Sequence, residues 1–119
     1  IADRVELNPY VSSRAALARL YAAARCVVMP GEHEAFGLVA LEAAASGASV
    51  AACLTAPTLH AIGHLGHGFV PGDPGALDRA IAAARAAPPD PAGAAALGWR
   101  HRWDRVFDAE LASLRDLLG

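Results

Sequence analysis

Short apolar runs alternate with segments of helical periodicity over the first two thirds of the chain. Strands are expected at four strand-like segments, 4–7, 26–29, 49–53 and 68–71. The run at 26–29 is continuously apolar, which is typical of a strand buried on both faces of a parallel sheet. Strands that alternate with helices in this way predict an α/β fold with a parallel sheet.

Three helices are expected between and after these runs, each with a recognisable start. A serine at position 12 or 13 can cap a helix that extends to about residue 25. A second helix is expected over 36–45, where it meets a Ser-Gly pair. Asp73 precedes a proline, so it is expected to cap a third helix that has proline in its first turn.

Beyond a proline-rich linker at 88–91 the pattern becomes entirely helical. We therefore divide the chain into a sheet-containing part, residues 1–87, and a linker with C-terminal helices, residues 88–119. Trp99 and Trp103 are expected to anchor the core or an interface. The last helix carries apolar residues three to four positions apart, a stripe that must pack on something: Trp103, Phe107, Leu111, Leu114 and Leu118.

The composition indicates a soluble globular protein, with 55 % hydrophobic and 18 % charged residues. The net charge of −2 provides no general attraction to nucleic acid or to anionic lipid. Cys26 and Cys53 both lie in strand-like runs, so we expect two buried, reduced thiols. Reduced thiols and the lack of a secretion signal indicate a reducing compartment, and we therefore expect the protein in the cytoplasm.

The loop at 30–38 is the first candidate for a site, because it follows the carboxyl end of a predicted strand. Ligands of parallel sheets bind at that edge. A helix that begins near Phe36 leaves the N–H groups of Gly37, Leu38 and Val39 without intrahelical partners, at the positive end of the helix dipole. These amides suit a diphosphate, and a glycine permits its close approach.

Two glutamates flank this helix start. Glu42 lies about a turn and a half into the helix, where its carboxylate can accept hydrogen bonds from the two hydroxyls of a ribose. Glu34 precedes the helix and is better matched to sugar hydroxyls or to a developing positive charge. The simpler explanation is that acidic residues near a helix N-terminus are favoured by the dipole.

Three histidines form the second candidate, a metal site. Glycines separate His60, His64 and His67 and would break any helix that aligned them, and no carboxylate or cysteine is interleaved. We therefore expect no metal.

The stretch Glu34-Ala-Phe-Gly-Leu-Val-Ala-Leu-Glu42 resembles the E-x7-E motif of the group 1, family 4 retaining glycosyltransferases, which have the GT-B fold. The surrounding segments 17–52 and 69–81 also resemble that family, and Trp103-Asp104 with the following helix resembles its C-terminal helix. The resemblance implies a Rossmann-like parallel sheet, namely the later part of the C-terminal, donor-binding domain, followed by a C-terminal helical segment.

The resemblance also implies roles for the candidate residues. Glu34 would contact and orient the donor sugar and would be the catalytic residue. Backbone amides from Phe36 to Val39 would hold sugar hydroxyls and diphosphate, and Glu42 would bind the ribose of a nucleotide-diphosphate sugar. Transfer would retain the anomeric configuration by front-side departure of the diphosphate, without a bound metal or another cofactor.

The chain departs from the family pattern in two respects. Residues 56–60 lack the glycines and the glutamate of the usual Gly-Gly-x-Pro-Glu loop. The strands that carry the phosphate-binding Arg and Lys would lie upstream of Ile1, and the N-terminal acceptor-binding domain is missing. We expect a nucleotide sugar and an unknown acceptor as partners, and an inactive chain in isolation.

Two other functions remain open. A sugar-nucleotide epimerase of the same fold would keep the nucleotide attached to its product. A non-catalytic or degenerate GT-B-like interaction module would explain the altered loop, and the C-terminal helix could then form a homodimer. Peripheral association with the inner membrane face is a further alternative to a purely cytoplasmic location.

Overall fold

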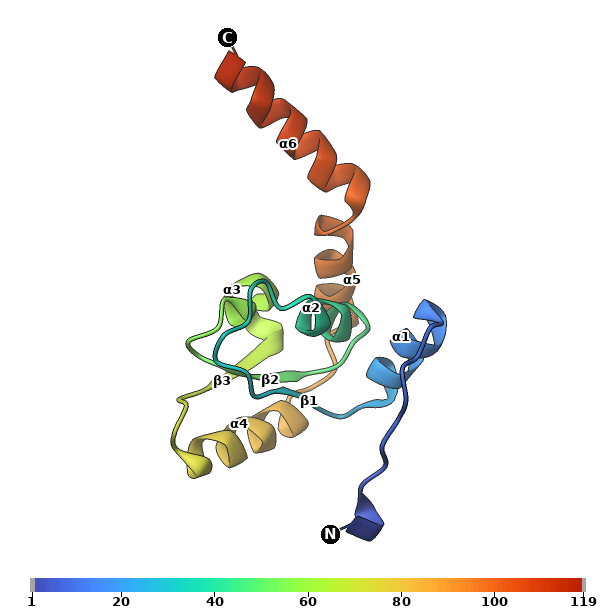
Figure 1. The fold of residues 1–119 in the computed structure, drawn as a ribbon, viewed down its shortest axis with the longest axis vertical. Coiled ribbons are helices and arrows are strands. Elements are labelled where there is room, and N and C mark those ends of the chain that lie inside the picture. Colours follow the sequence, from blue (N-terminus) through green and yellow to red (C-terminus); the bar gives the residue numbers. More distant parts are fainter. Residues whose placement is uncertain (1, 119) are drawn as a thin grey trace.

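A computed structural model describes residues 2–118 and confirms the α/β fold with a parallel, Rossmann-like sheet. The strands are β1 (Val27–Met29), β2 (Val50–Cys53) and β3 (Gly66–Phe69). All pair in parallel in the order β1-β2-β3, so β2 is central (Figure 1). In register, Val28 and His67 lie on either side of Ala51.

The described part of the chain also contains six α-helices and two short 3-10 helices. Two of the predicted helix starts are confirmed: the Ser13 hydroxyl accepts from the Ala16 N–H at 3.2 Å, and the Asp73 carboxylate accepts from the Gly75 N–H at 2.9 Å. The helices are α1 (Arg14–Ala23), α2 (Leu38–Ala45), α3 (Thr58–Ile62), α4 (Pro74–Ala86), α5 (Pro91–Arg100) and α6 (Trp103–Leu118), with η1 (Ala2–Arg4) and η2 (Gly63–Leu65).

The strand predicted at 4–7 is wrong. Residues 5–7 lie in exposed, irregular chain, and Leu7 is 90 % exposed. A four-residue segment forms a strand only when a neighbour supplies its hydrogen bonds, and no strand lies beside this one among residues 2–118. The fourth predicted strand exists as β3 but begins at Gly66, because pairing with Val50 of β2 sets its start.

The expectation that the run at 26–29 is buried on both faces is also wrong. Val28 is 38 % exposed, because it shares a sheet face with Ala51 and the helix on that face, α4, packs on β2 and β3. Cys26, just before it, is half-buried, whereas Cys53 in the central strand is fully buried. Both thiols are free, as predicted, and burial raises the pKa of the Cys26 thiol.

The core consists of two clusters, one on each face of the sheet. Val50 and Ala52 face α2 and α3 and pack in the cluster that holds Ile62. Ala51 and Cys53 face the other way, toward α4. Figure 1 shows α4 below the sheet and α2 and α3 above it. Alanines provide most of both clusters, which allows helices and strands to approach closely.

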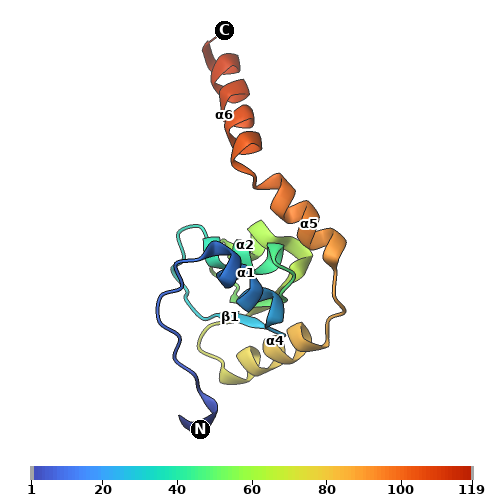
Figure 2. The same ribbon diagram turned by 90° about the vertical axis from the view of Figure 1, so that its right-hand side faces the viewer.

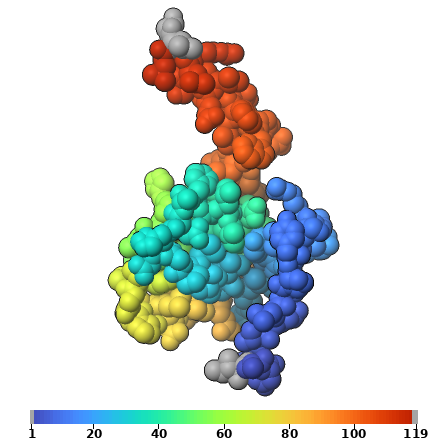
Figure 3. Space-filling model, viewed as in Figure 1, coloured from blue at the N-terminus to red at the C-terminus, as the bar shows by residue number. Residues whose placement is uncertain are grey.

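The helices after the linker differ in how they pack. Leu97 of α5 is 1 % exposed and belongs to the core cluster beside α2. In contrast, α6 extends away from the rest of the molecule in both ribbon views and in the space-filling view (Figures 1, 2 and 3). Its apolar stripe is therefore uncovered among the described residues, with Phe107 56 % and Leu111 48 % exposed. Pairing of two copies through α6 stays a prediction.

Neither tryptophan lies in the core, so that part of the expectation is wrong. Trp99 is 52 % and Trp103 76 % exposed. The Arg105 guanidinium lies 3.5 Å from the centre of the Trp99 ring, and the Trp103 ring lies 5.9 Å from that of Phe107. No helix in the described range 2–118 combines the length and apolarity required to cross a bilayer.

Candidate functional site

The loop 30–37 leads from the carboxyl end of β1 into α2 (Figure 1). The helix begins at Leu38, two residues later than predicted, because Gly37 adopts the left-handed region with φ 75°. No side chain caps it, and its first hydrogen bond runs from the Leu41 N–H to the Gly37 carbonyl at 3.1 Å. The amides that precede this bond therefore belong to residues 38–40, one position later than predicted.

The side chains around this helix start are apolar and turned outward. Phe36 is 57 %, Leu38 63 % and Val39 43 % exposed, whereas Gly37 is buried. The first turn of α2 thus combines backbone N–H groups with an exposed apolar rim.

Glu42 lies one turn further along α2 and lines a cavity of about 490 Å³ together with Phe36 and Leu38. The walls come from α1, α2, α5 and the first turn of α6, and include Arg14 and Trp103. No hydrogen bond or ion pair occupies the Glu42 carboxylate among the described residues. This carboxylate can therefore accept hydrogen bonds from a ligand.

Glu42 also lines a second, smaller cavity of about 250 Å³ against α1, with Tyr21 and Arg14. The pKa of Tyr21 is raised, first because its hydroxyl is partly removed from water and second because the charge of Glu42 opposes a phenolate. The charge of Glu42 therefore acts on both sides of α2.

Glu34 is half-buried and lies outside the cavity that Glu42 lines. Its side chain folds back over the start of its own loop, so that its Oε1 atom lies 3.5 Å from where a Cβ on Gly31 would be. The structure therefore brings Glu42, Phe36 and Leu38 to one cavity, while Glu34 remains in the loop beside them.

Thr58, which sequence reasoning missed, lies against this helix start. It is the first residue of α3 and fully buried, and no partner for its hydroxyl exists within residues 2–118. A Cβ added to Gly37 would lie 2.5 Å from the Thr58 Oγ1 atom. The altered loop at 56–60 was the only signal in the sequence, and it did not single out the threonine.

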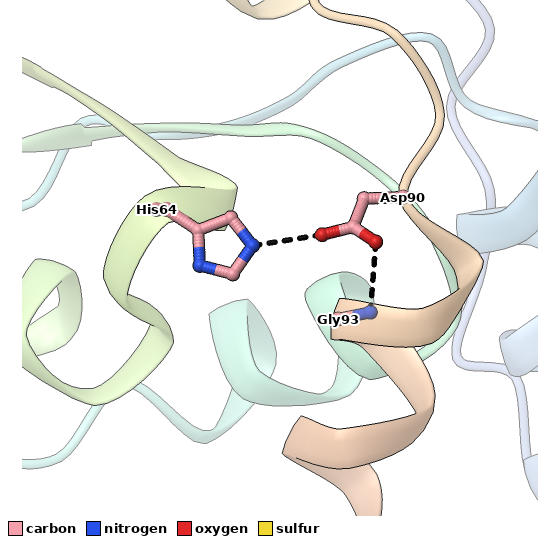
Figure 4. Close-up of polar contacts among 3 residues, drawn as sticks. All are labelled: His64, Asp90 and Gly93. Atoms are coloured by element: carbon pink, nitrogen blue, oxygen red, sulfur yellow. Dashed lines mark hydrogen bonds and ion pairs between the residues drawn. The ribbon is translucent and has the colours of Figure 1, made fainter.

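The histidines do not form a metal site. His64 Nε2 lies 2.8 Å from a carboxylate oxygen of Asp90, and the other oxygen accepts from the Gly93 N–H at 2.8 Å. Figure 4 shows the two contacts. The His64 hydrogen bond, followed by that of Gly93, holds the pKa of Asp90 below its ordinary value. Over residues 2–118, no group of three His, Cys, Asp or Glu side chains could hold a metal ion.

The His64–Asp90 contact joins η2 to the first turn of α5. Both residues line a cavity of about 390 Å³ that also includes Ser49, just before the amino end of β2. Because the strands are parallel, this contact lies at the opposite edge of the sheet from the loop 30–37.

Residues 1–51 match the protein-family model described as "Family 4 Glycosyltransferase in conflict systems". This span is less than half of the chain, but it contains α1, β1 and α2 and every candidate residue from Glu34 to Glu42. The match supports a family 4 glycosyltransferase, and hence a transferase. No curated protein and no solved structure matches the chain.

Proposed function

We propose that this chain holds the nucleotide-diphosphate sugar of a retaining glycosyltransferase, as the later part of the C-terminal domain of a GT-B enzyme. One observation carries the proposal. The unoccupied carboxylate of Glu42 lines a cavity one turn beyond the free amides that begin α2, at the carboxyl edge of a parallel sheet. The family match over residues 1–51 supports the same function.

The diphosphate would bind at the first turn of α2. The amides of residues 38–40 point out of the helix start together with the positive end of the dipole, and Gly37 has no side chain that obstructs an anion. Hydrogen bonds to a charged group contribute about 1.5–3 kcal/mol each. In this proposal, backbone donors stabilise the departing diphosphate in place of a metal ion.

The nucleoside would extend from there into the cavity of about 490 Å³. Glu42 is four residues beyond Leu38, which corresponds to about 6 Å along the helix axis. Its carboxylate would accept the two ribose hydroxyls. The rings of Phe36 and Trp103 line the same cavity and offer flat apolar surface to a base.

The donor sugar would then lie on the loop side, near Glu34, which would orient it for transfer with retention of configuration. The acceptor and the groups that complete catalysis would come from an N-terminal domain and upstream strands. This proposal assigns the diphosphate, ribose and sugar contacts to residues 1–87, whereas residues 88–119 contribute Trp103 to the wall that faces the base. Transfer would take place in the cytoplasm.

The test replaces Glu42 with Gln and measures the binding of UDP, GDP and ADP by calorimetry. We expect one nucleotide to bind, and Glu42→Gln to weaken it about tenfold or more, because a charged acceptor is lost while the fold is kept. Glu110→Gln, the same change on exposed α6, is the matched control. If Glu42→Gln binds the nucleotide with the same affinity as wild type, Glu42 is excluded from the site. Wild type that binds none of the three would refute donor binding by this chain.

A further inference from the structure

Thr58 carries the one buried side-chain polar atom without a hydrogen-bond partner among residues 2–118. The residue has 0 % exposure, so bulk solvent does not reach its hydroxyl. Valine has nearly the same shape without the polar atom and would fill the same space at lower free energy. A buried hydroxyl left in this state needs a reason beyond packing.

The hydroxyl lies beside the candidate donor site. A Cβ on Gly37 would be 2.5 Å from the Thr58 Oγ1 and 3.2 Å from its Cγ2, so Oγ1 occupies the side of Gly37 where a side chain would project. Gly37 is the residue immediately before the first turn of α2. The threonine thus adjoins the amides of residues 38–40.

The topology explains why two distant segments meet here. Loop 30–37 follows β1, and Thr58 lies in the first turn after β2, the neighbouring parallel strand. Both connections therefore leave the sheet at the same edge. The helix amides come from the first connection, and the hydroxyl comes from the second.

We propose that Thr58 is a further donor-site residue, whose hydroxyl donates a hydrogen bond to a phosphate oxygen bound at the start of α2. This inference rests on the proposed function. The ligand oxygen is the acceptor that the hydroxyl otherwise lacks. In the structure Gly37 lies beside the hydroxyl and both residues are buried, so the ligand oxygen would reach it only when the backbone at Gly37 shifts, which the lack of a side chain makes less costly.

The experiment measures the dissociation constants of inorganic pyrophosphate and of UDP, GDP and ADP for wild type, Thr58→Val and Thr58→Ser. Thr55→Val is the matched control, since Thr55 is exposed in the same connection and its hydroxyl lies 3.1 Å from the Cys53 sulfur. We expect Thr58→Val to bind pyrophosphate and the preferred nucleotide at least about fivefold more weakly. Thr58→Ser and Thr55→Val should bind as wild type does.

A stability measurement distinguishes a binding role from a structural one. Thr58→Val should unfold at the same or a higher urea concentration than wild type, because it removes an unpaired buried polar atom. Should Thr58→Val fail to fold, Thr58→Ala removes the same hydroxyl and allows the same comparison.

The outcomes separate this inference from the function on which it rests. If wild type binds a nucleoside diphosphate and Thr58→Val binds it with the same affinity, the role of Thr58 is overturned and donor binding stands. Wild type that binds neither pyrophosphate nor any of the nucleotides would overturn both. Weaker binding by Thr58→Val with retained binding by Thr58→Ser supports the inference.

Discussion

Replacing Gly37 with alanine tests how the start of α2 is held against α3. Gly37 has φ 75°, in the left-handed region, and an added Cβ would approach the Thr58 Oγ1 to 2.5 Å and its Cβ to 3.1 Å. Thr58 is fully buried at the start of α3, so it has little room to move. The substitution should therefore destabilise the fold through two separate effects.

The first effect is conformational. An alanine in the left-handed region costs about 1–2 kcal/mol, and the lower entropy of the unfolded alanine chain offsets about 0.4–1 kcal/mol of this. The second effect is steric, since overpacking a filled core typically costs about 1–3 kcal/mol. Together they predict that Gly37→Ala lowers the free energy of unfolding by about 1–5 kcal/mol.

Two other glycines separate these effects. Gly47 and Gly72 have φ 96° and 82°, and a Cβ on either would meet nothing within 4 Å. Gly47→Ala and Gly72→Ala should therefore show only the conformational cost, about 1 kcal/mol. Urea denaturation followed by circular dichroism measures all three variants on one scale.

The double variant Gly37→Ala/Thr58→Ala completes the test. Removal of the Thr58 hydroxyl and methyl leaves room for the new Cβ, so Gly37→Ala should cost less in this background than in wild type. The reasoning would be refuted by a Gly37→Ala variant no less stable than the Gly47 and Gly72 controls. An equal cost in both backgrounds would also refute it.

Two further predictions concern the core and the edge of the sheet that is opposite the site. Ile62→Ala should lower the free energy of unfolding by about 2–5 kcal/mol in urea, because Ile62 is 1 % exposed in the main cluster. Leu7 is 90 % exposed, so Leu7→Ala should change the free energy of unfolding by no more than about 0.5 kcal/mol. Similar losses of stability in Ile62→Ala and Leu7→Ala would contradict the difference in burial. The pKa of Asp90 lies below its ordinary 3.8, so its contribution to stability is present above that pH and is lost as pH falls through the folded-state value. Asp90→Asn should thus lower the urea midpoint near neutral pH but not at strongly acid pH, and a pH-independent difference would contradict this sign.

The family match and the fold give different kinds of support to the candidate site. The match covers the loop and α2 with both glutamates, but it ends within β2 and does not reach Thr58 or the helices α5 and α6 that complete the Glu42 cavity. The roles of residues 34–42 were predicted from the motif, and their test is the binding experiment with Glu42→Gln.

The sequence by itself determined the features that depend on neighbours within a few positions. The helix starts at Ser13 and Asp73, the runs that became β1 and β2, and the parallel α/β arrangement all follow from capping residues and from the spacing of apolar positions. Asp73, for example, accepts its hydrogen bond from an amide only two residues away, so no distant contact is needed.

The tertiary structure decided the features that join segments far apart along the chain. Pairing with β2 set the start of β3, and the packing of α4 on β2 and β3 left Val28 of β1 exposed in a run that looked buried. The contact between Gly37 and Thr58 joins the connections after two adjacent strands. The cavity at Glu42 needs walls from α1, α5 and α6. Local periodicity does not encode such contacts, because they depend on how the chain folds back on itself.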